Sequence, residues 1–506
     1  MLWKDLLALV PAIHGEGDGN PRIECVVDDS RSARPGALFV ARGGSRTDGG
    51  SFMADAVARG AVAVVAAPGA SVPQGVAVGR TDRPHLAAAM LAHAFHGFPA
   101  RHMQVAGVTG TNGKTTIAFL LQQCMQSAGR RFGLIGTVTQ DDGVTRAPSQ
   151  LTTPGAIELA ELLARMRRNG CVGVSMETSS HALNQGRVHG LDFGVAVFTN
   201  LSGDHLDYHG TMEAYASAKA RLFEGLDNSA TAVVNADDPA HARMLRDCRA
   251  LVVRCGFSGG DALDAEVSVL EARLGSMRIR LRGPWGEIQA RLPVMGRHNC
   301  MNALQAVAAA WALGADTPSL ERAMSAATAP PGRLEPVTDP DAPFAVMVDY
   351  AHTDDALLNV LKALRPALPP GGRLIAVFGC GGDRDRSKRP RMARVAAEFA
   401  DQVVITSDNP RTEDPQAIIR EIESGVPPHR ADRVCSVVDR REAIHRAVQM
   451  ARTGDAVVIA GKGHEDYQII GAERRPFDDR AVAREALQHA GIPALATFWR
   501  RSRWRR

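Results

Sequence analysis

One short stretch constrains the fold of this chain more than any other. The apolar run "MQVAGVTG" (residues 103–110) has the length of a β-strand, and "TNGKTT" (Thr111–Thr116) and a helical pattern to about Ser127 follow it. Glycines permit an unusual turn there, and backbone amides at the start of a helix can cradle phosphate oxygens. A strand, a Gly-rich turn and a Lys-Thr-Thr helix start together predict a phosphate-binding loop.

The loop departs from the strict G-x-x-x-x-G-K-[ST] pattern, because Gly107 lies one position before the first glycine of that pattern. Lys114 is expected to reach the β- and γ-phosphates of ATP, and the Thr115 hydroxyl is expected to reach a magnesium ion. A plain Gly-rich turn without a ligand is the alternative. The predicted ATP-binding residues of the loop are Gly110, Thr111, Asn112, Gly113, Lys114, Thr115 and Thr116.

Composition limits the classes of protein to consider. The chain has 506 residues, 45% of them hydrophobic, which predicts two to four domains. We expect a cytoplasmic, monomeric protein without stable membrane insertion. No apolar run is long enough to cross a bilayer, the N-terminus does not read as a signal peptide, and the eight cysteines are scattered. The whole chain has a net charge of +4, and its tail 499–506 holds five arginines. The rest of the chain shows no basic stripe that would indicate nucleic-acid binding.

Strand-like and helix-like segments alternate along three parts of the chain, which predicts an α/β fold with mostly parallel sheets. Residues 1–100 read as a small α/β domain, 101–333 as the central domain with the phosphate loop, and 334–498 as a third domain. Residues 499–506 form an Arg-rich tail, most simply a frayed terminus and alternatively a docking segment. In the third part, polar loops follow the strands, and such loops bind ligands in open α/β sheets.

The loop "GTNGKTT" (Gly110–Thr116) resembles the ATP loop of the Mur ligase family, the amide-forming enzymes of peptidoglycan assembly. Folylpolyglutamate and cyanophycin synthetases carry a similar loop. The resemblance implies a three-domain architecture with a central P-loop-type parallel-sheet domain and a Rossmann-like C-terminal domain. It also implies ATP and Mg²⁺ as cofactors and a requirement for closure of the third domain.

Several further segments resemble functional segments of this family. Glu177, at the end of the strand in "METSSHAL", is a plausible magnesium ligand. His205 resembles a second metal-binding side chain, and Lys219 matches a lysine that the family carries as a carbamate; without the resemblance, Lys219 would read as a solvated helix lysine. The remaining nucleotide candidates are Asn299, for which a helix N-cap role is the alternative, and Asp349 and His352 with Tyr350 in "VDYAHTDDAL".

The resemblance also extends to the nucleotide-linked peptide, UDP-MurNAc-L-Ala-D-Glu. Ser30 matches a UDP-contacting serine in "DDSRSARPGALFVA" (Asp28–Ala41). The chain departs from the family at Ser45, Arg46 and Thr47, where a His-Gln-Ala triplet is common. The residues that match contacts to the muramoyl-dipeptide are Thr152, Thr153, Ser179, Gln185 and Arg187.

Two motifs, "DNPRTEDP" (Asp408–Pro415) and "GKGHEDYQ" (Gly461–Gln468), resemble the MurE-type branch, which adds meso-diaminopimelate. Arg411 and Arg389 are expected to hold the two carboxylates of diaminopimelate, and Asn409 and Glu465 to accept from its ammonium. Lysine lacks the distal carboxylate, and a site built for a polar group rejects an analogue without it. The predicted diaminopimelate-binding residues are Arg389, Asp408, Asn409, Pro410, Arg411, Gly461 and Glu465.

The resemblance implies an ATP-dependent amide ligation through an acyl phosphate of the D-Glu γ-carboxylate. The implied catalytic residues are Lys114, Lys219 and His205. The implied metal ligands are Thr115, Glu177, His205 and carbamylated Lys219. The alternatives within the ligases are a lysine-adding relative and a MurF-, MurD- or folylpolyglutamate-type ligase. From another class, the alternatives are a P-loop ATPase switch and a nucleotide-gated binding module. The switch would hydrolyse ATP without an amino-acid acceptor.

Overall fold

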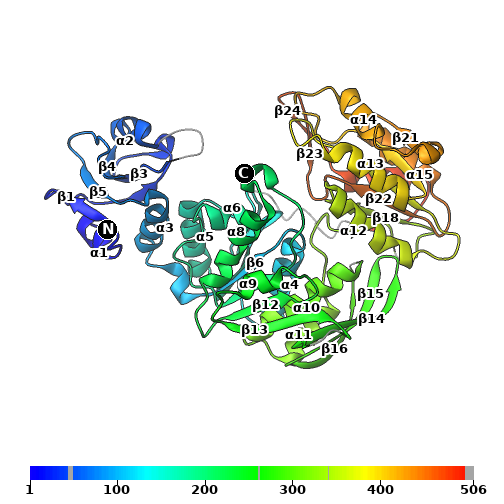
Figure 1. Cartoon of the computed structure of the whole chain (residues 1–506), viewed down its shortest axis with the longest axis horizontal. Helices are drawn as coiled ribbons and strands as arrows, with labels where there is room; N and C mark the ends of the chain where they lie inside the picture. Colours follow the sequence, from blue (N-terminus) through cyan, green and yellow to red (C-terminus); the bar gives the residue numbers. More distant parts are fainter. Residues whose placement is uncertain (44–48, 260–261, 294, 340, 496–506) are drawn as a thin grey trace. The chain divides into compact units, whose positions relative to one another are not determined.

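Figure 1 shows a computed structural model of the chain, coloured along the sequence. The chain separates into two units. Unit 1 holds residues 1–255, 261–264 and 305–320, and unit 2 holds 256–260, 265–304 and 321–506. The structure describes residues 1–43, 49–259, 262–293, 295–339 and 341–495. The Ser45–Thr47 triplet and the Arg-rich tail therefore lie outside the described residues.

Unit 1 begins with a five-stranded sheet in the order β1-β5-β4-β3-β2. Its strands are β1 (His14–Glu16), β2 (Cys25–Val27), β3 (Ala37–Val40), β4 (Ala61–Ala66) and β5 (Ala77–Arg80), of which only β1 pairs antiparallel. Its helices are α1 (Trp3–Ala8), α2 (Met53–Ala58) and α3 (Pro84–Phe95), with short 3₁₀ turns η1 (Ser30–Ser32), η2 (Gly49–Phe52) and η3 (Pro99–His102). The apolar runs "GALFVA" (Gly36–Ala41) and "AVAVVAAP" (Ala61–Pro68) predict two strands, and β3 and β4 confirm them.

The second sheet of unit 1 carries the phosphate loop. β6 (Gln104–Thr109) lies between β10 (Gly173–Glu177) and β11 (Val195–Phe198), and all three strands are parallel. Short apolar β-branched runs such as "VAVF" form these strands because helices cover them and both faces are buried. The sheet has eleven strands, and the others that precede residue 258 are β7 (Phe132–Ile135), β8 (Thr139–Asp141), β9 (Arg146–Pro148), β12 (Thr231–Asn235) and β13 (Leu251–Phe257).

The helices of this region follow the strands in the order expected of an α/β fold. α4 (Lys114–Ser127) begins directly after the loop, one residue from the predicted start. The others are α5 (Ala156–Arg168), α6 (Ser180–Asn184), α7 (Leu206–His209), α8 (Met212–Glu224), α9 (His241–Leu245), α10 (Arg297–Ala312) and α11 (Thr317–Ser325).

Unit 2 contains a six-stranded sheet in the order β17-β18-β22-β19-β20-β21. Its strands are β17 (Glu335–Pro336), β18 (Ala345–Asp349), β19 (Leu374–Phe378), β20 (Gln402–Ile405), β21 (Val434–Ser436) and β22 (Ala456–Ala460), and all but β17 are parallel. Its helices are α12 (Asp354–Leu364), α13 (Lys388–Phe399), α14 (Pro415–Glu423), α15 (Arg440–Met450) and α16 (Asp479–His489), with the 3₁₀ turns η4 (Arg365–Ala367) and η5 (Pro428–Arg433). The sequence predicts four strands in this part of the chain, in "FAVMVDYA", "RLIAVFGCGG", "DQVVITSDNP" and "DAVVIAGKG", and β18, β19, β20 and β22 confirm them.

Antiparallel strands were not predicted. β14 (Ala265–Arg273), β15 (Ser276–Gly283) and β16 (Gly286–Leu292) form a meander, and β23 (Tyr467–Ile470) and β24 (Glu473–Pro476) form a hairpin. β7, β8 and β9 also pair antiparallel. Buried and exposed residues alternate in β16, which is the pattern of a sheet with one solvated face.

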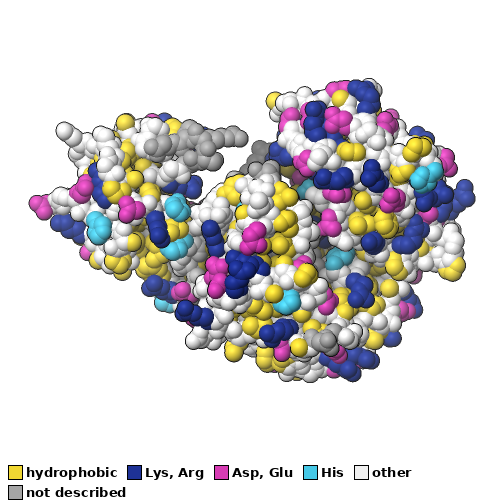
Figure 2. Space-filling view, in the orientation of Figure 1, with side chains coloured by type: hydrophobic (Ala, Val, Ile, Leu, Met, Phe, Trp, Pro, Cys, Tyr) yellow, Lys and Arg dark blue, Asp and Glu magenta, His cyan; other side chains and the backbone are white. Residues whose placement is uncertain are grey.

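The surface carries both signs of charge. On the face shown in Figure 2, Lys and Arg side chains are interspersed with Asp and Glu side chains. None of the helices in the described ranges combines the length and the apolar character that a membrane crossing requires.

Candidate active site

The phosphate loop has the backbone that its sequence predicts. Gly110 and Gly113 have φ of +146° and +88°, values that favour glycine. A Cβ on Gly110 would lie 1.8 Å from the hydroxyl oxygen of Thr199, so a side chain there has no room. The loop therefore needs glycine at this position for packing as well as for its conformation.

The segment after β11 holds the loop in place. The Thr111 amide donates to the Asn200 carbonyl at 2.9 Å, and the Asn112 amide donates to the Asn200 side-chain oxygen at 3.0 Å. The Thr199 hydroxyl donates to the Asn112 carbonyl at 2.6 Å. These contacts fix the loop before any ligand binds, which reduces the ordering cost of binding.

Two lysines converge on one carbonyl of the loop. Lys114 Nζ donates to the carbonyl oxygens of Gly110 (3.0 Å) and Thr111 (2.7 Å), and Lys219 Nζ donates to that of Gly110 at 2.8 Å. Lys219 is 1% exposed and its Nζ lies 4.2 Å from the centre of the Tyr215 ring. Burial, reinforced by the Lys114 charge, lowers the pKa of Lys219 well below its usual value. The alternative of a solvated helix lysine is therefore wrong.

Glu177 ends β10 and is buried. Its carboxylate accepts from the amide (2.7 Å) and the hydroxyl (3.0 Å) of Thr137. A Cβ on Gly136 would lie 2.4 Å from the carboxylate, so a glycine lets the two segments approach. Buried carboxylate oxygens with few cationic neighbours suit a hard divalent cation.

The structure brings together the residues matched to the muramoyl-dipeptide. The Thr152 hydroxyl lies 3.0 Å from that of Thr137, which itself donates to Glu177. The Ser179 amide donates to Thr153 Oγ1 at 3.0 Å. Arg187 donates to the Thr153 carbonyl (2.9 Å) and to Gln185 Oε1 (2.9 and 2.7 Å).

Histidine and tyrosine rings cluster beside the loop. His205 has a φ of +54°, which is unusual for a residue with a side chain, and its ring centre lies 4.8 Å from that of His181 and 6.3 Å from that of Tyr215. The Tyr215 hydroxyl lies 3.3 Å from Thr111 Oγ1. The sequence prediction omitted His181, which lies within "METSSHAL", and Tyr215, which lies between His205 and Lys219 in the sequence.

Ser30 is buried at the start of η1. Its hydrogen bond to the Asp55 side chain is the main cause that lowers the pKa of Asp55. Ser30 is therefore held against α2.

In unit 2, Asp349 organises the segment before the sheet. Its carboxylate accepts from the amides of Leu334 and Ala351, both at 2.7 Å, and burial raises its pKa. The ring centres of His352 and Tyr350 are 4.7 Å apart. Asp349 therefore fixes two backbone segments while His352 lies beside them.

Asn299 lies inside α10 rather than at its N-cap. Its amide donates to the Met295 carbonyl at 2.8 Å and its oxygen accepts from Asn302 at 3.0 Å. The N-cap alternative is therefore wrong.

The motifs Asp408–Pro415 and Gly461–Gln468 fold onto one another in unit 2. Asn409 accepts from Lys462 Nζ at 3.0 Å and donates to Glu465 at 3.0 Å. Lys462 is fully buried, 3.4 Å from Asp408 and 3.5 Å from Glu465. Burial and the Asp408 charge raise the pKa of Glu465, and Gly461 packs against Asp408 with a φ of +119°.

Arg411 adopts a φ of +51°. Its guanidinium donates to the Gly382 carbonyl at 2.7 Å, and its amide donates to the Ile469 carbonyl at 3.1 Å. Gly382 also packs closely against the carbonyl of Pro410. Arg384, exposed on the same loop, lies with Arg411 beside Gly381.

The structure gives Arg389 a different role from the predicted one. Its side chain is 0% exposed, and its guanidinium donates to Glu413 (2.9 and 3.0 Å) and Glu421 (2.7 Å). A guanidinium committed to two carboxylates presents no accessible fork to a ligand. In this conformation Arg389 braces the loop. Arg384 and Arg386 are exposed on that loop, and Arg386 pairs with Glu413.

Sequence reasoning also missed a buried ion pair beneath the motifs. Arg440 donates to both oxygens of Asp479 (2.8 and 2.7 Å), to the Ser407 carbonyl at 3.2 Å and to the Ala460 carbonyl at 2.9 Å. It therefore ties together the ends of β20 and β22, from which the two motif loops begin. The pattern around Arg440 is that of an ordinary helix start, so no local signal marks it.

Three family models match the chain. They are "Mur ligase family, catalytic domain" over residues 22–97, "Mur ligase middle domain" over 108–310 and "Mur ligase, glutamate ligase domain" over 332–463.

Relatives and solved structures agree with these matches. The UDP-N-acetylmuramoyl-L-alanyl-D-glutamate–2,6-diaminopimelate ligase of Geobacillus thermodenitrificans is 44% identical, over 96% of this chain and 99% of the relative. The enzyme of that name from Gloeobacter violaceus is 46% identical, over 91% and 92%. A solved structure of a ligase of that name is 34% identical with a TM-score of 0.70, over 96% and 99%. MurF of Thermotoga maritima, solved with ADP, is 19% identical with a TM-score of 0.60 over 92% and 96%, and shares the fold. The chain belongs to the Mur ligase family, whose three-domain α/β architecture it has.

Proposed function

We propose that this chain is an ATP-dependent ligase that joins meso-2,6-diaminopimelate to the D-Glu γ-carboxylate of UDP-MurNAc-L-Ala-D-Glu in peptidoglycan precursor synthesis. The observation that carries the proposal is the contact between the Asp408–Arg411 motif and the Gly461–Glu465 motif, which makes one polar, charged site at the ends of β20 and β22. The names of relatives 44–46% identical to this chain support the same substrates.

The phosphate loop supports ATP as the energy source. The loop amides and Lys114 would hold the triphosphate, and Lys114 would exchange its carbonyl partners for phosphate oxygens. Asn299, Asp349 and His352 are the proposed adenosine-side residues. In the first step, a γ-carboxylate oxygen of the peptide attacks the γ-phosphorus of ATP and ADP leaves.

In the second step the diaminopimelate amine attacks the acyl phosphate, phosphate leaves with the former carboxylate oxygen, and the amine loses a proton. Placing the two reactants accounts for much of such a rate enhancement. Thr152, Thr153, Ser179, Gln185 and Arg187 are the proposed peptide-side residues, and Ser30 the proposed UDP-side residue. The hydrogen bonds among Thr153, Ser179 and Arg187 support a common surface.

Thr115, Glu177 and His205 would hold magnesium, which when bound offsets negative charge on the transferring phosphoryl group. The buried Glu177 carboxylate fits this use, since it lies among neutral donors.

We propose that Lys219 carries a carbamate. Its amine nitrogen would attack CO₂ and release a proton, which converts a cation into an anion able to bind a second magnesium. A buried amine with a lowered pKa is neutral more often than a solvated one, and only the neutral amine attacks CO₂.

The hydrogen bonds and burial of the motif residues in unit 2 support a division of roles in the proposed diaminopimelate site. Asn409 Oδ1 already accepts from Lys462 and from the Ile469 amide, so we assign Asn409 to positioning. Asp408 Oδ1 is buried and lies 3.4 Å from Lys462 Nζ, but among the described residues it has no hydrogen-bond partner; this supports Asp408, with Glu465, as acceptor for the distal ammonium. Arg411 and Arg384 are the proposed partners of the distal carboxylate.

We propose that the chain has three domains, over residues 1–100, 101–333 and 334–498. We also propose that the enzyme is monomeric and cytoplasmic. The family-model matches support this division in outline. All eight cysteines are free, which agrees with a reducing compartment.

Isotope transfer tests the chemistry. The peptide substrate is labelled with ¹⁸O in the D-Glu γ-carboxylate and incubated with ATP, Mg²⁺ and meso-diaminopimelate. We expect one ¹⁸O in the released phosphate. We also expect a product whose mass is the sum of the labelled peptide and diaminopimelate, less the mass of one H₂¹⁸O. Product without label in phosphate would contradict the acyl phosphate, and absence of product would contradict the function.

A further inference from the structure

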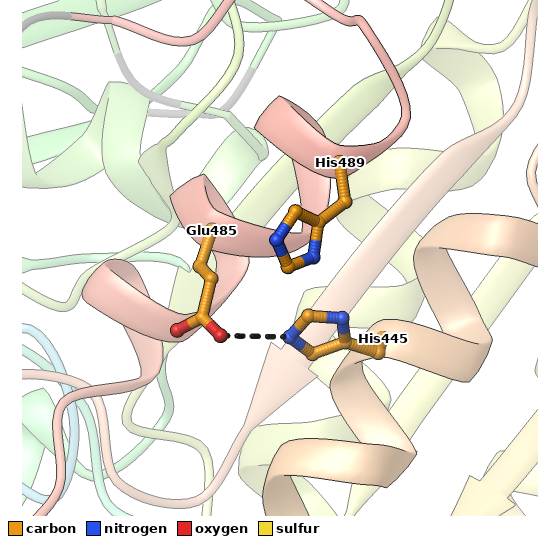
Figure 3. Close-up of side chains that lie close together, drawn as sticks. All are labelled: His445, Glu485 and His489. Carbon is orange, nitrogen blue, oxygen red and sulfur yellow. Dashed lines mark ion pairs between the residues drawn. The ribbon is translucent and has the colours of Figure 1, made fainter.

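Two helices of unit 2 place three potential metal ligands together, apart from the motifs used above. His445 belongs to α15, and Glu485 and His489 belong to α16 (Figure 3). One ligand atom from each side chain lies within 4.8 Å of the other two. Glu485 and His489 are four residues apart, so they share one face of their helix.

His445 points its ring into this cluster. Its Nε2 lies 3.6 Å from a Glu485 carboxylate oxygen, and the ring centres of His445 and His489 are 5.5 Å apart. Nε2 is shielded from solvent and, among the described residues, has no hydrogen-bond partner, although the side chain is 21% exposed. A shielded ring nitrogen aimed at a carboxylate and a second imidazole is an arrangement that a cation would complete.

The carboxylate is held ionised from its other side. Arg441 pairs with the second oxygen of Glu485, and this hydrogen bond is the main cause that lowers the pKa of Glu485. The oxygen facing His445 is thus left for another partner. An outer hydrogen bond of this kind orients a carboxylate for coordination through one oxygen.

We propose that His445, Glu485 and His489 form a binding site for a divalent transition metal of the zinc type, distinct from the magnesium sites of the ligase reaction. Two imidazoles and one carboxylate select zinc, nickel or copper over magnesium or calcium, which take oxygen ligands. Neighbouring ligands of tetrahedral zinc are about 3.4 Å apart for bonds of about 2.1 Å, so side-chain rotation closes the site. The fourth position would hold water.

The position of the site gives the metal a structural consequence. The same two helices form the buried Arg440–Asp479 ion pair, which ties the ends of β20 and β22. A metal that links α15 to α16 would stabilise this helix pair, because a ligand that binds only the folded state raises its stability.

Zinc titration of the tag-free, chelator-treated full chain tests the proposal, with excess Mg²⁺ present to occupy oxygen-rich sites. The variants are His445→Gln, Glu485→Gln and His489→Gln. We expect one zinc equivalent in the wild type, an affinity at least about tenfold weaker in each variant, and a zinc-dependent rise in Tm that the variants lose.

Two control variants separate this site from other histidines. His429→Gln removes an exposed histidine of unit 2, and His205→Gln alters the ring cluster of unit 1. Both should keep the zinc equivalent and the Tm rise. A wild type that binds no zinc, wild-type zinc affinity in His445→Gln and His489→Gln, or loss of the zinc equivalent in His205→Gln would overturn the proposal.

Discussion

At the scale of single residues, Lys219 is the most informative position. A Lys219→Ala variant removes the amine on which the proposed carbamate forms, so turnover should fall by about 100-fold or more. Formate or acetate should restore part of it by supplying a carboxylate to the vacated space. The measurement is kcat with and without the added acid.

Lys4→Ala, at an exposed lysine, is the matched control and should keep wild-type turnover. Full turnover of Lys219→Ala without added acid would exclude a catalytic role for the carbamate.

The arginines at 384 and 389 should respond differently to substitution. Arg389→Ala breaks a buried ion-pair network, which costs roughly 3–5 kcal/mol of stability. Arg384→Ala removes an exposed side chain, so Tm should hold while KM for diaminopimelate rises by about tenfold or more. Thermal melts and steady-state kinetics on both variants check this. A stable Arg389→Ala variant with only a raised KM would return Arg389 to the ligand-binding set.

Acid should act on this network through Glu413. Its hydrogen bonds to Arg389 lower the pKa of Glu413 from 4.5 to about 2. The folded-state pKa is depressed, so this stabilisation is present above pH 4.5 and disappears as the pH falls towards 2. Glu413→Gln should therefore be less stable than the wild type at pH 7, and the gap should narrow by pH 3. A gap in Tm that stays constant across this range would contradict the assignment.

At the scale of elements, the phosphate loop makes the sharpest prediction. A Cβ at residue 110 meets Thr199 at 1.8 Å, so Gly110→Ala must displace the loop from the segment that holds it. ATP binding should weaken by at least tenfold, or about 1.4 kcal/mol. Gly225→Ala, where a Cβ would make only ordinary contacts, is the control. Equal ATP affinity in the two variants, measured by titration, would contradict the role of the loop.

The sequence predicted those elements whose apolar runs are buried on both faces. β6, β18, β19, β20 and β22 lie within apolar runs predicted as strands, and so do β10 in "CVGVSMET" and β11 in "FGVAVFTN". The meander β14–β16 escaped prediction because its side chains alternate between a buried and a charged face, as in "GEIQARL", and such strands lack a continuous apolar run. The mostly parallel character of the fold was predicted, and its antiparallel additions were not.

Two structural features of the candidate site follow from motifs at strand ends. They are the glycine conformations of the loop at residues 110–116 and the closeness of the loops that begin at Asp408 and Gly461. The buried state of Arg389 did not follow, because its partners Glu413 and Glu421 come from a distant loop and helix. Arg440 had no motif at all, and its role depends on tertiary contacts with β20 and β22.

At the scale of the whole molecule, the assigned residues divide between the two units. The phosphate loop, Glu177 and Lys219 belong to unit 1, whereas Asp349 and the diaminopimelate motifs belong to unit 2. Each set is already ordered by its own hydrogen bonds. The proposed reaction needs chemistry from both sets, so phosphate release should depend on the amino-acid substrate as well as on ATP.

The most direct test is phosphate release from ATP with UDP-MurNAc-L-Ala-D-Glu present, compared among meso-diaminopimelate, L-lysine and no amino acid. We expect release only with diaminopimelate, because lysine leaves the arginines at 384 and 411 without a carboxylate. Release with lysine at a similar rate would contradict this reading of the site. Phosphate release at the same rate with diaminopimelate, with lysine and without an amino acid would contradict the proposed ligation itself.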